Sequence, residues 1–75
     1  MSGPTIGRIV HFVLPYGHVG AVRPAVVIEA TGLRVDLHVF TKPGDHCAPY
    51  AAQAEFSPIA KPGTWHWPDR PTSPA

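Results

Sequence analysis

Apolar and polar residues alternate along several short stretches of this chain, and prolines and glycines separate the stretches. The clearest alternation is LRVDLHVF, residues 33–40, in which one set of alternate positions is entirely aliphatic: Leu33, Val35, Leu37 and Val39. Successive side chains of a strand point to opposite faces, so a period of two indicates a strand with one buried face. We therefore predict an antiparallel strand over residues 33–40 whose four aliphatic side chains face the core.

Three other stretches are rich in the β-branched and aromatic residues that favour strands. They are GRIVHFVL, AVVIEA and TWHW, at residues 7–14, 25–30 and 64–67. AEFSPI, residues 54–59, is predicted to be a short edge strand, because Pro58 cannot donate a hydrogen bond to a central ladder. The Thr-Gly pair at residues 31–32 predicts a tight hairpin turn.

Long connections at residues 15–24 and 41–53 join these strands, and APYAAQAEF, residues 48–56, is compatible with a helical turn. Elsewhere the ten prolines leave little room for helices, because each removes a donor and disfavours the helical conformation of the preceding residue. Short strands and long loops predict an all-β fold, a small SH3-like barrel over residues 7–68, with an OB-like barrel as the alternative. Residues 1–6 are expected to be a flexible N-terminus and residues 69–75 a disordered tail.

The length of 75 residues limits the chain to one domain with a small core, so we expect homo-oligomers to supplement its stability. Cys47 is the only cysteine, which excludes an internal disulfide and a four-cysteine zinc site and fits a reducing cytoplasm. Polar and turn residues interrupt the apolar segment 8–22, so we predict neither a targeting signal nor a membrane span. A net charge of +1 argues against long duplex DNA as a partner.

Five histidines raise the question of a metal site: His11, His18, His38, His46 and His66. Only His46 and Cys47 adjoin, and no pair has a recognised ligand spacing, so we predict no metal and no cofactor. The acidic residues are scattered, and the chain has no phosphate-binding loop, dinucleotide fingerprint or hydrolase elbow. We therefore expect a protein that is not an enzyme.

Both tryptophans lie in GTWHW, residues 63–67, on either side of a histidine. In a strand Trp65 and Trp67 share one face and His66 has the other, so the tryptophans either close the core or form a surface for a ligand. We expect Trp65 to be mainly structural and Trp67 to be partly accessible. Aromatic rings that stack on a base, with cations that meet phosphate, would bind a nucleotide. The candidate ligand-binding residues are Tyr16, His18, Arg23, Lys42, His46, Trp65, His66 and Trp67.

Four stretches, GRIVHFV, PAVVIE, VDLHVF and PGTWHWP, carry a resemblance that covers most of residues 7–68. They resemble a family of small proteins of tailed phages and prophages with an opening G-R-x-V-x-[FY]-V strand and a closing P-G-[ST]-W-H-W-P motif. The loop TKPGDHCAPYAAQ departs from the family pattern, so loop residues are not carried over. The resemblance implies a small phage-type β-barrel located in the cytoplasm of an infected or lysogenic bacterial host.

Our leading hypothesis is a non-enzymatic binding protein that sequesters a small anionic, nucleotide-derived immune signal of the host. The alternative is a structural, virion or protein-interaction module in which the aromatic residues only pack. Binding of single-stranded nucleic acid is disfavoured by the low net charge.

Overall fold

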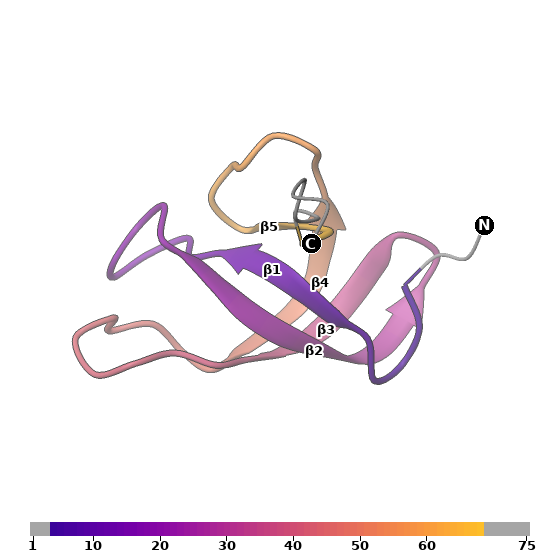
Figure 1. The fold of residues 1–75 in the computed structure, drawn as a ribbon, viewed down its shortest axis with the longest axis horizontal. Coiled ribbons are helices and arrows are strands. Elements are labelled where there is room, and N and C mark those ends of the chain that lie inside the picture. Colours follow the sequence, from indigo (N-terminus) through magenta and orange to yellow (C-terminus); the bar gives the residue numbers. More distant parts are fainter. Residues whose placement is uncertain (1–3, 69–75) are drawn as a thin grey trace, which may run out of the picture.

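The computed structural model describes residues 4–68, which contain five strands and no helix (Figure 1). The predictions for residues 1–3 and for the tail 69–75 lie outside the described residues. The strands are β1 (Ile9–Val13), β2 (Val22–Thr31), β3 (Arg34–Val39), β4 (Tyr50–Phe56) and β5 (Thr64–His66). Residues 4–68 contain no helix with the length and hydropathy needed to cross a membrane.

The strands close into a barrel in their chain order. Strands β1 to β4 form an antiparallel meander, and β5 returns to pair antiparallel with β1 and parallel with the end of β4. The prediction of a small all-β barrel is therefore confirmed. An OB-like barrel, the alternative, would need a Greek-key order of strands. The meander order corresponds to the SH3-like barrel that was predicted first.

The predicted and observed strands differ most at β2 and β4. Strand β2 starts three residues before the predicted position and includes Pro24, whose carbonyl accepts a hydrogen bond from the Phe40 amide at 2.9 Å. Strand β4 spans Tyr50–Phe56, so it begins four residues earlier and ends three residues earlier than the edge strand predicted at residues 54–59. The helical turn considered for residues 48–56 does not form. Pairing with β3 outweighs the helical preference of the alanines in this segment.

Three of the four residues predicted for the core face of β3 are buried, namely Val35, Leu37 and Val39. The fourth prediction is wrong, because Leu33 is 53% exposed. Leu33 lies with Gly32 in the turn between β2 and β3, where the strand alternation has not yet begun. Gly32 has a φ of +63°, a conformation that glycine adopts without steric cost.

Trp65 is the largest fully buried side chain of the core. Its indole Nε1 donates to the Leu33 carbonyl at 2.9 Å, so the polar atom is satisfied inside the barrel. Phe56 and Trp67 pack edge to face against it, with ring centroids 5.0 and 5.1 Å away. The buried residues packed in one cluster with Trp65 come mainly from β1, β2 and β3: Val10, Phe12, Leu14, Ala25, Val27, Val35, Leu37, Val39 and Ala54.

Candidate binding site

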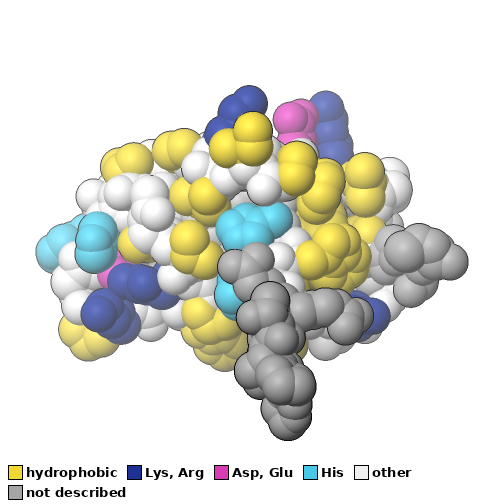
Figure 2. Space-filling model, turned by 45° about the horizontal axis from the view of Figure 1, so that its top comes forward, with side chains coloured by type: hydrophobic (Ala, Val, Ile, Leu, Met, Phe, Trp, Pro, Cys, Tyr) yellow, Lys and Arg dark blue, Asp and Glu magenta, His cyan; other side chains and the backbone are white. Residues whose placement is uncertain are grey.

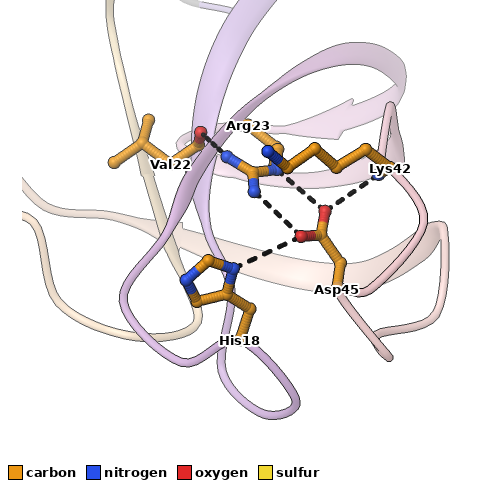
Figure 3. Close-up of polar contacts among 5 residues, drawn as sticks. All are labelled: His18, Val22, Arg23, Lys42 and Asp45. Atoms are coloured by element: carbon orange, nitrogen blue, oxygen red, sulfur yellow. Dashed lines mark hydrogen bonds and ion pairs between the residues drawn. The ribbon is translucent and has the colours of Figure 1, made fainter.

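A buried carboxylate joins the two long loops of the barrel. Asp45 belongs to the loop between β3 and β4 and is only 1% exposed. Arg23, at the start of β2, donates from Nε and Nη2 to its two carboxylate oxygens, both at 2.8 Å, and the Lys42 amide donates to Oδ2 at 2.9 Å (Figure 3). His18, in the loop between β1 and β2, places Nδ1 3.5 Å from Oδ1. We call Asp45 and these three partners the Asp45 cluster.

The Asp45 carboxylate stays ionised over a wide pH range. The hydrogen bonds from the Arg23 guanidinium, followed by the one from the Lys42 amide, hold its pKa well below the usual range. The same ion pair raises the pKa of Arg23. This charged, bidentate pair anchors the loop between β3 and β4 to β2, which preorganises the surface at this end of the barrel.

The backbone also closes the two loops against each other. The His18 amide donates to the Asp45 carbonyl at 2.8 Å. Gly17 has a φ of +73°, and a Cβ atom at this position would collide with the carbonyl oxygens of Asp45 and His46. Glycine at position 17 therefore allows the close approach of the two loops.

The structure separates the predicted binding residues into two groups. Tyr16, His18, Arg23, Lys42 and His46 lie at the end of the barrel formed by loops 14–21 and 40–49, which we call the loop end (Figure 1). In Figure 2 the left side shows histidine, Lys or Arg, and Asp or Glu side chains gathered there. Arg23 is predicted to meet phosphate, but its guanidinium is engaged by Asp45 in the present arrangement.

Trp65, His66 and Trp67 form the second group, and β5 carries them toward the start of β1. Trp65 is fully buried, as predicted for a structural residue, so it presents no surface to a ligand. Trp67 is half-buried, in agreement with the predicted partial accessibility, and the Arg8 guanidinium lies 5.1 Å from its ring centroid. The His66 ring packs edge to face against the His11 ring, with ring centroids 5.8 Å apart. We call the region around Trp67 and Arg8 the tryptophan end.

A pocket of about 230 Å³ lies beside the loop end, between β1, β4 and the residue that precedes β5. Among residues 4–68, those that line it include no charged residue and no histidine: Phe12, Pro15, Tyr16, Cys47, Ala48, Tyr50, Ala51, Ala52, Gln53, Ala54 and Gly63. The Tyr16 ring is half-exposed, and its hydroxyl accepts a hydrogen bond from the Ala48 amide at 3.2 Å. Tyr16 is thus the only predicted binding residue that lines the pocket.

Strand β4 forms one wall of this pocket with a largely open edge. Strand β5 pairs with β4 only at Glu55 and Phe56, through Thr64 and Trp65. Within residues 4–68, no strand pairs with Tyr50 to Ala54 on the edge opposite β3. An edge of this kind presents backbone donors and acceptors to a further extended segment.

No family model matches this chain, and neither the curated proteins nor the solved structures contain a significant match. The resemblance to the phage family therefore stays a prediction. The proposed function therefore rests on the chemistry of the pocket and its surroundings.

Two residues that the sequence did not single out shape the wall formed by β4. Gln53 has a φ of +56°, and its amide donates to the Asp36 carboxylate at 2.9 Å, at the irregularity between β3 and β4. Partial burial, and then the nearby Asp36 carboxylate, raise the pKa of Tyr50 above an ordinary value that already keeps the hydroxyl protonated at neutral pH. The pocket wall thus stays neutral.

Metal binding finds no support in the geometry of residues 4–68. In this part of the chain no three histidine, cysteine, aspartate or glutamate side chains converge on one point. Cys47 is a half-buried free thiol that lines the pocket.

Proposed function

We propose that this protein is a non-enzymatic protein-interaction module that binds an extended peptide segment of a partner along β4. The observation that carries the proposal is the uncharged pocket beside the open edge of β4, residues Tyr50 to Ala54. An extended peptide can pair its backbone with a sheet edge while one of its side chains enters an adjacent pocket. Both elements of that recognition mode are present at one place.

The chemistry of the pocket selects an apolar side chain of the peptide. A buried charge without a partner costs several kcal/mol, and no lining side chain carries a compensating charge. The alanines along β4 and Gly63 leave room for a bulky group, while Phe12 and Tyr16 offer aromatic contact. A leucine, methionine or aromatic side chain of the partner fits these walls.

Nucleotide capture is the second candidate function, and one observation favours it. His46 directly precedes Cys47 at the pocket wall, and its backbone lies against Gly17, the residue after the half-exposed Tyr16. Lys42 belongs to the same loop as His46. A base stacked on Tyr16 would place its phosphate outside the uncharged pocket, toward these side chains. Tyr16, which was predicted to stack on a base together with one of the tryptophans, would then do so without them.

Selection from a yeast-displayed random peptide library tests the first function. We expect recovered peptides to share one bulky apolar position within an extended segment and to lose at least about tenfold in affinity for Ala52→Trp, which fills the pocket. Ala60→Trp is the matched control, because Ala60 is exposed and does not line the pocket. Hydrogen exchange should show slower exchange at amides of β4 when peptide is bound, except at Gln53, whose amide already donates to Asp36.

Thermal stability with cyclic di- and trinucleotides tests the second function. A nucleotide at a hundred times its dissociation constant would stabilise the fold by about 2.7 kcal/mol. Nucleotide capture would be favoured over peptide binding by two results together. A nucleotide stabilises the parent but neither Tyr16→Ala nor His46→Ala, and the library selection recovers no peptide. Equal peptide affinity of Ala52→Trp and Ala60→Trp would contradict the assignment of the pocket.

A further inference from the structure

The outward surface of strands β1, β2 and β3 carries apolar side chains in neighbouring positions. Pairing places Ile9 beside Val26 and Val26 beside His38, and the Phe40 amide donates to the Pro24 carbonyl. On β2 the buried Ala25 and Val27 alternate with residues of the opposite face. We call this surface the outer face, and it consists of Ile9, Pro24, Val26, Ile28, His38 and Phe40.

Large apolar groups on the outer face are exposed to solvent. Phe40 is 50% exposed, Ile9 47% and Ile28 42%. His38 packs edge to face on Phe40 with ring centroids 5.6 Å apart, which continues the aromatic surface across β3. Large exposed apolar groups that adjoin on neighbouring strands are the kind of surface that interaction sites use.

We propose that the outer face pairs with the outer face of a second copy of this chain, about a two-fold axis. None of its six residues is Lys, Arg, Asp or Glu. The paired carboxylates Glu29 and Asp36 lie at its border, beside Ile28 and His38, so two copies can bury the apolar groups while these charges stay at the solvated rim. This composition corresponds to homodimer interfaces, which are more apolar than transient interfaces. A net charge of +1 also gives two copies little mutual repulsion.

A second copy would also add to the stability of a fold with a small core. A chain of 75 residues buries a small core, and oligomerisation is a common supplement in domains of this size. In an isologous pair each copy contributes the same surface, so a single apolar patch suffices. This inference goes beyond the proposed function, since it concerns β1 to β3 and leaves the pocket along β4 free to act independently.

Sedimentation equilibrium of the full chain, from about 1 to about 100 μM, tests the pairing. We expect the parent protein to approach twice the monomer mass as concentration rises. Phe40→Lys should weaken association by about 30-fold or more, as for a central interface residue. Ile59→Lys is the matched control: it adds the same charge at a 70% exposed position in the loop between β4 and β5, and it should dimerise as the parent does.

Ile28→Lys provides a second variant if Phe40→Lys does not fold, and circular dichroism reports folding for each protein. A folded Ile28→Lys or Phe40→Lys variant that is monomeric where Ile59→Lys is dimeric supports the proposal. A parent protein that is monomeric throughout the concentration range overturns it. Dimers that persist unchanged in both outer-face variants also overturn it, because the interface would then lie elsewhere.

Discussion

At the loop end the chain is held by a buried carboxylate and its donors, whereas at the tryptophan end it is held by packed aromatic rings. Asp45 ties its loop to β2 through charged hydrogen bonds to Arg23 and to the loop between β1 and β2 through His18, and both loops provide part of the pocket. Trp65 fixes strands through packing against Phe56 and Trp67. The first kind of contact depends on protonation and directed geometry, and the second depends on volume, so different perturbations should affect the two ends.

Trp65→Ala should have the largest effect, because it removes the largest buried side chain and the hydrogen bond to the Leu33 carbonyl. The expected loss is about 3–5 kcal/mol, enough to unfold a small domain. Thermal unfolding followed by circular dichroism measures it. Trp67→Ala, at a half-buried position, should remain folded, and equal losses for the two variants would contradict the distinction between core and surface.

Acid should weaken the loop end before it affects the packing of the tryptophan end. Because the folded-state pKa of Asp45 is below the ordinary carboxyl value of about 3.9, its contribution is complete above that value and is lost as the pH falls through the folded-state pKa. The melting temperature should therefore stay constant with respect to Asp45 from neutral pH to about pH 4 and should decrease at lower pH. Asp45→Asn should be less stable at pH 7 and lose less on acidification.

Glu55→Gln is the control for this pH experiment. Glu55 accepts a hydrogen bond from Arg34 at 2.8 Å, but both side chains are exposed, and exposed ion pairs contribute little. Its pH profile should follow that of the parent. If Asp45→Asn shows the same profile as Glu55→Gln, the Asp45 cluster does not control the stability of the loops.

Gly17→Ala should disturb the loop end by about 1–3 kcal/mol, because alanine is strained at this φ and its Cβ would push the two loops apart. Gly20→Ala is the matched control. Gly20 also has a positive φ, of +88°, but a Cβ there would meet no neighbouring atom within 4 Å. The difference in melting temperature between the two variants measures the contribution of the close contact between the loops. Equal melting temperatures would mean that the lack of a side chain at Gly17 is not needed for that contact.

Arg8→Ala should have the smallest effect, about 0.5–1 kcal/mol, because the cation over Trp67 is exposed. Denaturant unfolding in low and high salt would measure it. Arg8→Lys should retain part of the contribution, since a cation remains near the ring. A loss as large as that of Trp65→Ala would mean that Arg8 orders the tryptophan end rather than covering it.

Contacts between neighbouring residues in a strand were accessible to sequence reasoning. The alternation over residues 33–40 predicted the buried side chains of β3, and the closing motif predicted that Trp65 is buried while Trp67 is partly exposed. The error at Leu33 came from the turn, where alternation no longer reports a face. Periodicity therefore describes the middle of a strand better than its ends.

The Asp45 cluster could not be predicted from the sequence, because His18 and Arg23 lie more than twenty residues before Asp45 and no local pattern links them to it. Asp45 resembles an ordinary turn residue after proline and glycine. Strand β4 was missed in part because YAAQAEF lacks both alternation and β-branched residues, and only its pairing with β3 makes it a strand. The pocket depends on both features, which explains why Tyr16 was the single lining residue predicted.

The three-residue strand β5 also has a consequence for how the chain folds. It pairs His66 with His11 and Trp65 with Phe12, so the barrel closes through contacts between the two ends of the sequence. Bringing distant segments together costs loop-closure entropy before any packing energy is gained. We expect the meander of β1 to β4 to form first and the insertion of Trp65 to limit the rate. Substitutions that weaken β5 would then slow folding, whereas those confined to the outer face would leave the folding rate of the monomer unchanged.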